Sequence, residues 1–200
     1  MTALTRTGIT NLALRDLGGT RIEDWEEGSF EAIVARDVWD QAVRQALGRH
    51  GWQFAMRGVS LARQVDVPET RYAYRYTLPG DFVRLDAASA SDTMDPPLDD
   101  DGGFAIRDGV FETSAEQVFL EYVYDAPVIG VWPPWFVGVV SADLASFMAG
   151  SLKSTREREG LEALADKRLR EGLSTDSIQQ MTQRRPAGSW RRAARGGWRG

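Results

Sequence analysis

The chain has 200 residues, of which 42% are hydrophobic and 26% are charged, and its formal net charge is −5. This length and composition are ordinary for one folded domain with a hydrophobic core. The absence of cysteine excludes disulfides, zinc-thiolate sites and a cysteine nucleophile. Six of the 24 Lys and Arg residues lie in residues 184–200, which contain no acid, so these residues carry +6 and residues 1–183 carry −11.

The first predicted elements are two helices. Residues 5–17 have Thr5 or Thr7 available as an N-cap and end at Gly18-Gly19. A longer helix is predicted over residues 29–47, capped by Ser29. Its apolar residues recur at spacings of three and four, which is typical of a packed helix face: Phe30, Ile33, Val34, Val38, Ala42 and Ala46.

Residues 56–124 change to a period of two, which favours strands. Tyr72, Tyr74 and Tyr76 alternate with other residues before a turn at residues 78–81. Asp108-Gly109 predicts a tight hairpin turn, and residues 117–124 alternate again. We therefore expect one small antiparallel sheet, interrupted by an acidic loop at residues 92–101.

Two more helices are predicted after the sheet. Pro133 and Pro134 suit the first turn of a helix over residues 133–152. Ser154 and Glu157 form a capping box that opens a helix over residues 155–172, which Gly172 would end. The prediction is an α+β fold: an N-terminal helix pair and a C-terminal helical hairpin form a body over residues 1–183, with the sheet inserted between them.

Residues 184–200 form a predicted extended arm, because six arginines, a proline and four glycines cannot bury enough apolar surface to fold alone. A solvated end, nucleic-acid contact and protein docking are the three interpretations. The paired tryptophans favour docking, since aromatic side chains anchor interfaces. The candidate docking residues are Arg184, Arg185, Trp190, Arg191, Arg192, Arg195 and Trp198.

Catalytic chemistry has few candidates. His50 is the single histidine, and its place after a helix favours packing or capping. Residues 99–101 are three aspartates without the spacing of a calcium loop, so a solvated loop is favoured. No phosphate-binding loop or metalloprotease motif occurs. We expect no enzyme activity, no metal and no cofactor.

Two groups of aromatic residues are open to more than one interpretation. The tyrosines of residues 72–76 could stack nucleic-acid bases, but the acidic surroundings favour core packing. Trp132, Trp135 and Phe136 lie in a proline-rich apolar segment that suits either the core or a subunit contact. The longest uncharged run, residues 126–142, is too short for a typical membrane span, and residues 1–8 lack the apolar stretch of a signal peptide, so no membrane association is expected.

Four blocks of sequence carry a resemblance to a known family. They are Asn11-Leu12-Ala13-Leu14-Arg15, Arg36-Asp37-Val38-Trp39-Asp40, His50-Gly51-Trp52-Gln53-Phe54-Ala55 and Tyr72-Ala73-Tyr74-Arg75-Tyr76-Thr77-Leu78-Pro79-Gly80-Asp81-Phe82-Val83-Arg84-Leu85. In this order they resemble the head-tail adaptors of short-tailed phages, known as tail tubular protein A, with related adaptors in other tailed phages and in gene transfer agents. The similarity covers most of residues 4–172, and Gly188-Ser189-Trp190 followed by arginines resembles the family's ending. Gly51 stands where the family pattern leads us to expect proline.

The resemblance implies a structural connector of the virion or virus-like particle, assembled in the bacterial cytoplasm. It implies a ring, generally a dodecamer, that joins the portal protein to a tail or stopper protein. DNA would pass through the lumen without sequence-specific binding, and an acidic body would repel its phosphates. The alternative is a nucleic-acid-binding module that uses the arginine-rich tail, whose affinity would fall steeply with salt.

Overall fold

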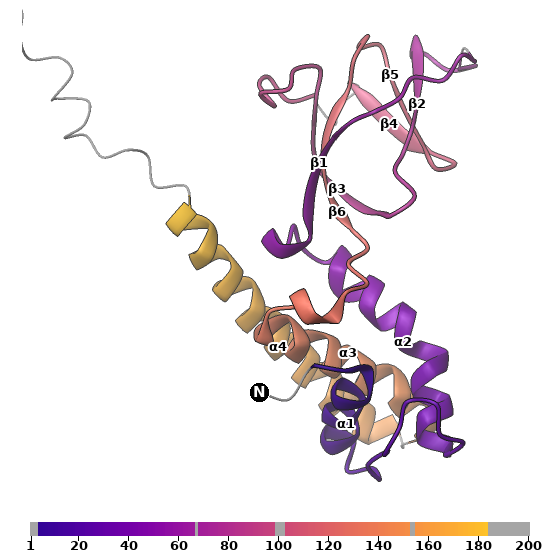
Figure 1. Cartoon of the computed structure of the whole chain (residues 1–200), viewed down its shortest axis with the longest axis vertical. Helices are drawn as coiled ribbons and strands as arrows, with labels where there is room; N and C mark the ends of the chain where they lie inside the picture. Colours follow the sequence, from indigo (N-terminus) through magenta and orange to yellow (C-terminus); the bar gives the residue numbers. More distant parts are fainter. Residues whose placement is uncertain (1–3, 67, 99–102, 153–154, 184–200) are drawn as a thin grey trace, which may run out of the picture.

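The chain folds as a helical module with a β module above it (Figure 1). The structure is a computed structural model that describes residues 4–66, 68–98, 103–152 and 155–183. Within these residues there are four α-helices and two three-stranded antiparallel sheets, so the predicted α+β class is confirmed. The division into a body and an arm at residue 184 stays a prediction, because residues 184–200 lie outside this description.

Both amino-terminal helices begin and end as the sequence predicts. In α1 (Arg6–Leu17) the cap is Thr5, whose Oγ1 accepts a hydrogen bond of 3.1 Å from the Gly8 amide. Gly18 ends the helix with φ at +66°, a conformation that glycine adopts without strain. In α2 (Phe30–Gly48) the Ser29 side chain accepts from the Ala32 amide at 3.4 Å.

The predicted apolar face of α2 is wrong at its first turn. Phe30 is 59% exposed and Ile33 is 42% exposed. A helix of 3.6 residues per turn places both of them opposite Trp39, Ala42 and Ala46, which are buried against the core. Spacing alone identified apolar residues but assigned two of them to the wrong side of the helix.

The predicted single sheet is two sheets. β1 (Met56–Ser60), β6 (Phe119–Tyr124) and β3 (Phe82–Ser89) form one, in the order β1-β6-β3. β2 (Tyr74–Thr77), β5 (Val110–Thr113) and β4 (Phe104–Arg107) form the other, in the order β2-β5-β4. Alternation predicts strands but not their partners, since pairing depends on which apolar sides meet across the core.

The predicted turns of the β module are confirmed. Asp108 and Gly109 have φ values of +50° and +75°, as the two central residues of a type I′ hairpin turn require. The Phe82 amide donates to the Pro79 carbonyl at 3.1 Å, which closes the turn before β3. The two-residue connection pairs β4 with β5, and the turn closed by Phe82 joins β2 of one sheet to β3 of the other.

The carboxy-terminal hairpin consists of α3 (Pro134–Leu152) and α4 (Thr155–Gln183), which pack against each other. The prediction that Gly172 ends the last helix is wrong, because α4 continues through it to Gln183. A Cβ added at Gly172 would lie 3.1 Å from Val139 Cγ2 and 3.5 Å from Trp135 Cε3. This glycine serves close helix packing rather than capping. The predicted capping box of Ser154 and Glu157 lies outside what the structure describes.

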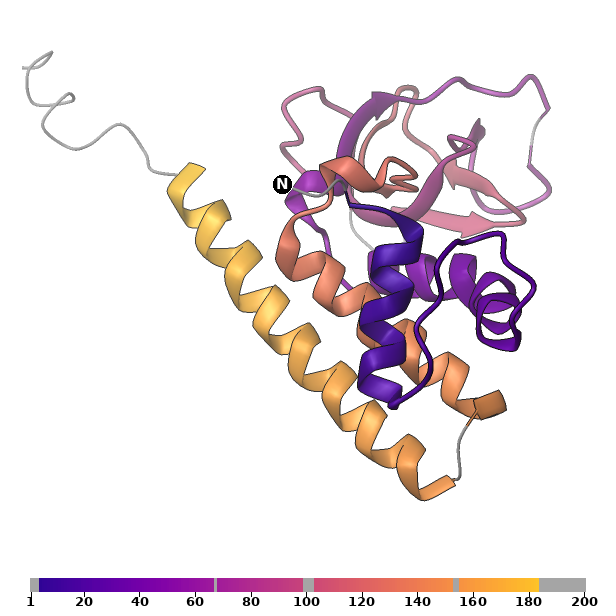
Figure 2. The ribbon, with the colours of Figure 1, turned by 60° about the horizontal axis from the view of Figure 1, so that its bottom comes forward.

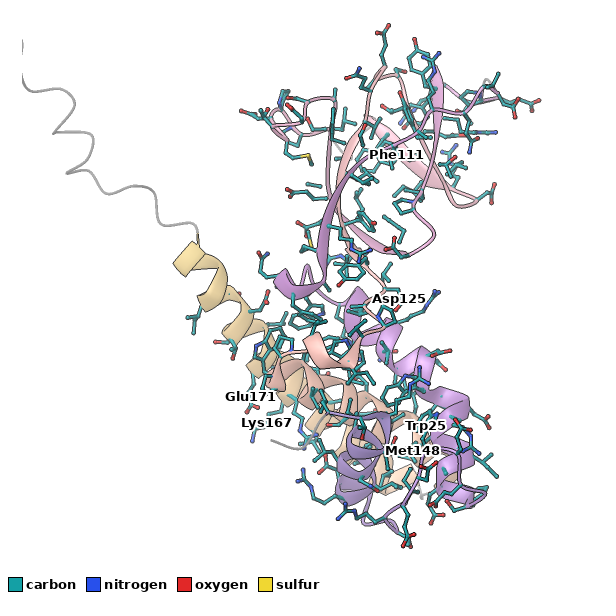
Figure 3. All side chains as sticks on the ribbon, viewed as in Figure 1. Trp25, Phe111, Asp125, Met148, Lys167 and Glu171 are labelled. Carbon is teal, nitrogen blue, oxygen red and sulfur yellow. The ribbon has the colours of Figure 1, made fainter. Side chains whose placement is uncertain are left out.

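Two hydrophobic cores support the two modules. The core of the helical module is formed by residues of all four helices together with Trp52, and the core of the β module surrounds Phe111 between the two sheets. Figure 3 labels Phe111 in the β module, Met148 in the helical module and Asp125 at the junction between them. The Asp125 amide donates to the Asp81 carbonyl at 2.7 Å, and its carboxylate lies 3.6 Å from Arg44 of α2.

The carboxy-terminal turns of α4 extend past the rest of the helical module (Figures 1 and 2). Buried positions of this helix run from Leu161 to Asp176, whereas Ile178 is exposed. None of the described helices is both long and apolar enough to cross a membrane.

Candidate functional site

The candidate site is α4 together with the surface that holds it. The predicted docking residues, Arg184 to Trp198, lie outside the described residues, so their contacts are not assigned. Their attachment point is described, because α4 ends at Gln183, the residue that precedes Arg184. The packing of α4 therefore determines where residues 184–200 start.

An aromatic seat, formed by Trp52, Phe54, Trp135 and Phe136, lies where α4 packs. The Trp52 ring centroid is 5.2 Å from that of Trp135 and 5.6 Å from that of Phe136, while Phe54 and Phe136 are 4.7 Å apart. Trp52 and Phe136 are fully buried, and the Trp52 indole donates to the Ala46 carbonyl at 2.8 Å. Gly172 lets α4 approach Val139 and the rings of the seat closely.

The two interpretations of the proline-rich segment can now be separated. Trp132 is buried, stacks on Trp39 at 6.4 Å and donates its indole hydrogen to the Ala126 carbonyl at 2.8 Å. Phe136 is buried in the aromatic seat, and Trp135 is half-buried there. Burial within one chain assigns Trp132 and Phe136 to the core rather than to a subunit contact.

Arg168 joins three helices. Its guanidinium lies 2.7 Å from Asp16 Oδ2 of α1 and donates to Ser141 Oγ of α3 at 3.0 Å. Both partners are shielded from solvent, since Ser141 is buried and the Asp16 side chain is 10% exposed. A charge pair in such a place is costly to break, because removing one partner leaves the other poorly solvated. Arg168 therefore fixes α4 against α1 and α3.

A second buried carboxylate lies on α3. Asp143 is the single charged residue of α3 and accepts a hydrogen bond of 2.9 Å from Arg49 at the end of α2. Burial raises its pKa to about 6, and the nearby Arg49 opposes part of that rise. This ion pair joins the carboxy-terminal end of α2, where the segment that leads into the β module begins, to α3, the helix on which α4 packs.

His50 and Asp176 make a third polar contact. The His50 ring packs edge-on against Trp52 with centroids 4.9 Å apart, and its Nε2 lies 3.3 Å from Asp176 Oδ2. The Gln53 amide donates to Asp176 Oδ1 at 3.3 Å. The predicted packing role of His50 is confirmed. This contact holds the fully buried Asp176 of α4 against the segment that leads into β1.

The tyrosines of residues 72–76 also pack rather than present a stacking surface. Tyr72 and Tyr76 are buried, and their hydroxyls donate to the carbonyls of Phe104 at 2.8 Å and Ala115 at 2.6 Å. In the part of the chain that the structure describes, no three His, Asp or Glu residues gather closely enough to hold a metal ion. The contacts of Arg168 and Asp176 anchor α4 to the rest of the helical module and to the segment before β1.

No family model and no curated protein matches this chain.

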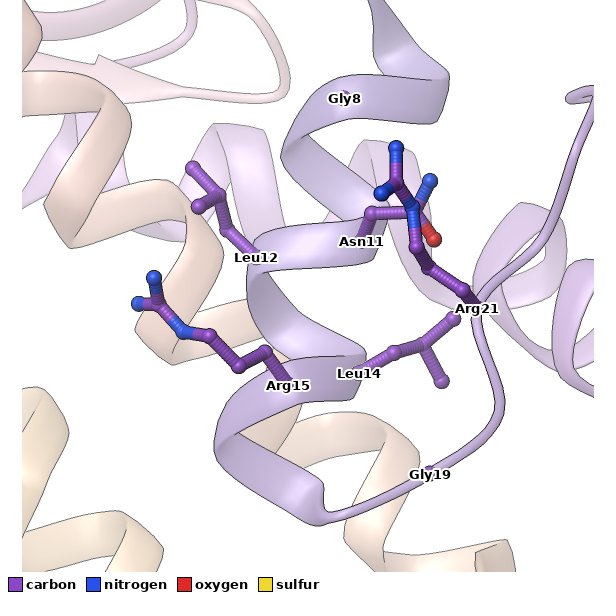
Figure 4. Close-up of a pocket in the computed structure, with 7 residues that line it drawn as sticks. All are labelled: Gly8, Asn11, Leu12, Leu14, Arg15, Gly19 and Arg21. Atoms are coloured by element: carbon purple, nitrogen blue, oxygen red, sulfur yellow. The ribbon is translucent and has the colours of Figure 1, made fainter.

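An open groove of about 530 Å³ lies on the outer side of α1 (Figure 4). The groove is lined by the apolar side chains of Leu12 and Leu14 and by Gly8 and Gly19, which have no side chain to fill it. The side chains of Arg15 and Arg21 lie at its two sides. No local pattern in the sequence predicts this groove, because it forms where α1 and the loop after Gly18 come together.

The ion pairs of the helical module carry few signals in the sequence. One signal was present for Asp143, which is a lone acid within an otherwise uncharged apolar helix. No comparable signal marked the partly buried Arg168 or the buried Asp176, since α4 contains many charged residues and only tertiary packing distinguishes these two.

Proposed function

We propose that this chain is a structural head-tail connector, a ring-forming adaptor below the portal that joins a DNA-filled head to a tail. The observation that carries the proposal is the anchored, projecting α4. One end of the helix is fixed to the body, the other extends outward, and the basic residues 184–200 follow it in the sequence. Such a helix positions a docking segment at a distance from the body that bears it.

The blocks of sequence that resemble phage adaptors supply the residues of this framework. The block at residues 50–55 contains His50 and Gln53, which contact Asp176 of α4, and Trp52, which lies beside Gly172 of α4. Gly51 is buried beside Asp86, and an added Cβ would lie 2.4 Å from Asp86 Oδ1. A side chain at this position requires the exposed Asp86 carboxylate to turn away. Gly51, which stands where the family pattern leads us to expect proline, therefore lies at a close contact between the end of the helical module and β3.

Charge supports passage of DNA through a lumen. Residues 1–183 carry −11, and a surface of that sign repels phosphate. The proposed partners are the portal protein, a tail or stopper protein and further copies of the chain in a dodecameric ring. The proposed location is the head-tail junction of a virion or of a gene transfer agent. No catalytic step is part of this function.

In the docking step, Trp190 and Trp198 would be buried on the portal or a neighbouring copy, with arginines paired to acidic groups around them. Burying a tryptophan is worth on the order of several kcal/mol at about 25 cal/mol per Å². Repetition around a ring raises the effective concentration of each arm. Tryptophan contacts should therefore dominate attachment.

The test is a head-attachment assay with variants of the full chain. Deleting residues 184–200 should abolish stable joining of heads to tails, and Trp190→Ala with Trp198→Ala should be nearly as damaging. Neutralising Arg195 and Arg199 should be milder. Each variant should keep the thermal unfolding midpoint of the parent protein, which separates loss of docking from loss of folding. Normal joining by the truncated protein would refute the proposal.

A nucleic-acid-binding module is the second candidate, favoured by six arginines in the last 17 residues. Salt distinguishes the two. Binding to DNA through six arginines should weaken steeply between about 50 and 200 mM salt, whereas docking anchored by tryptophans should keep much of its affinity. Loss of duplex DNA binding on deletion of residues 184–200, with head attachment intact, would favour this candidate.

A further inference from the structure

Two surfaces on the helical module remain unexplained by the packing of a single chain. One is the groove on α1, and the other is the exposed side of α2. We propose that the exposed side of α2 in one copy docks into the α1 groove of a second copy. This inference rests on the proposed function, because it assigns the side-by-side contact of the ring.

The groove is basic in an acidic chain. Between Leu4 and Ile22 there are three arginines and one acid, Asp16, which already lies within ion-pair distance of Arg168 and Arg15. The Arg15 side chain is 65% exposed. Among the described residues no acid lies within ion-pair distance of Arg21. The groove therefore offers two accessible guanidiniums beside an apolar lining.

The α2 stripe, defined as Phe30, Ile33, Asp37 and Asp40, has the opposite character. These positions follow one another along the exposed side of the helix at spacings of three and four. Phe30 and Ile33 are large exposed apolar side chains, and burying them would be favourable. Within the described part of the chain neither Asp37 nor Asp40 lies within ion-pair distance of a cation.

The two surfaces match in both apolarity and charge. Phe30 and Ile33 of one copy can cover Leu12 of the other, because Gly8 and Gly19 leave room above it. Asp37 and Asp40 of the first copy then lie near Arg15 and Arg21 of the second. Opposite charges at the rim of an apolar contact select the partner and its register. The basic residues 184–200 are disfavoured in this groove because they would bring six more positive charges to it.

The contact joins two different surfaces of the same chain. Both α1 and α2 pack on α3, and Figure 2 shows them on different sides of it. A contact between unlike surfaces leaves one of each free on every dimer, so further copies can add until a ring closes. A contact between like surfaces would stop at the dimer.

Cysteine trapping tests the contact directly, because the chain has no cysteine of its own. A Cβ at Gly8 would meet Thr5 Oγ1 at 3.4 Å, which is ordinary contact, so Gly8→Cys fits the groove. The full chain carrying Gly8→Cys and Ile33→Cys is oxidised at high protein concentration and separated without reductant. We expect a ladder of dimers, trimers and larger products. Each single variant alone should give no ladder, and a mixture of the two should give dimers.

Charge reversal supplies the second arm. Adding Arg15→Glu and Arg21→Glu to the double-cysteine protein should reduce the ladder by about tenfold or more, since like charges then face each other. Adding Asp37→Arg and Asp40→Arg to that protein reverses both sides and should restore the ladder. The matched control is Arg63→Glu with Arg107→Glu, two exposed residues of the β module, and should leave the ladder unchanged.

Several outcomes would overturn the contact. The first two are the absence of a ladder and a ladder that charge reversal does not change. The third is that Gly8→Cys alone gives as many dimers as the mixture of the two single variants. The fourth is that duplex DNA, by competing for the groove, removes the ladder. Absence of the ladder with normal head attachment would overturn this contact and leave the proposed function standing. A charge-dependent ladder with no head attachment would support the contact and refute the proposed function.

Discussion

Asp143 shows how one buried side chain makes stability depend on pH. It is 1% exposed on the apolar helix α3, and its ion pair with Arg49 offsets only part of the cost of burying its charge. Its folded-state pKa of about 6 lies above the ordinary value of 3.8. The folded protein therefore holds this proton more tightly than the unfolded chain does, and the contribution of Asp143 to stability falls as pH rises from about 4 to about 6.

We predict that Asp143→Asn gains stability relative to the parent protein across the same pH window. At pH 4 both side chains are neutral, whereas at pH 7 the parent bears the buried charge. The difference corresponds to at most about 3 kcal/mol. Denaturant unfolding of both proteins at pH 4, 5, 6 and 7 measures it. The exposed Asp37→Asn serves as the control, and a difference that does not change with pH would contradict the prediction.

At the scale of elements, α4 shows that two glycines of one helix have opposite roles. Gly172 is buried where α4 meets α3 and the aromatic seat, so its missing side chain allows the close packing. Gly160 is exposed, and an added Cβ there would have no neighbour within 4 Å. The first glycine is required by tertiary packing, while the second only lowers the intrinsic stability of the helix.

Substitution of the two glycines should therefore change stability in opposite directions. Gly172→Leu should lower the free energy of unfolding by about 1–3 kcal/mol, because the side chain would collide with Val139 and Trp135. Gly160→Ala should raise it by up to about 1 kcal/mol. Chemical denaturation checks both, and hydrogen exchange should show faster opening of α4 in the Gly172 variant alone. Equal effects of the two substitutions would mean that α4 is not seated as described.

At the scale of the whole molecule, charge opposes self-association. Each copy carries −11 over residues 1–183, and copies placed side by side repel one another unless local complementary contacts or a partner overcome that repulsion. The proposed α1–α2 contact involves few charges and a small apolar area. Such a weak contact suits a ring whose copies are held together by a shared partner as well as by one another.

We therefore predict that the isolated full chain is largely monomeric in dilute solution at physiological salt, and that rings form on the portal. Light scattering of the purified protein should give a mass near the 22.2 kDa of one chain. Addition of the portal protein should produce the ring. Stable rings of the isolated chain under those conditions would show that the proposed template is unnecessary.

Local sequence signals were sufficient for much of the fold. Thr5, Ser29 and Gly18 mark helix ends through hydrogen bonds and backbone conformations that depend on neighbouring residues only. Asp108-Gly109 likewise determines its turn by itself. The charge difference between residues 1–183 and 184–200 is also a property of the sequence alone, and it supports the predicted arm without reference to the fold.

Tertiary structure decided the features that depend on distant residues. Gly172 looks like a helix end in sequence, but the surfaces of Trp135 and Val139 make it a packing position and let α4 continue. Phe30 looks like a core residue, but α3 packs on the other side of α2 and leaves it exposed. The pairing of strands into two sheets, the burial of Asp143 and the groove beside Arg15 and Arg21 follow from the same cause. Each depends on which surfaces meet, and spacing along the chain does not encode that.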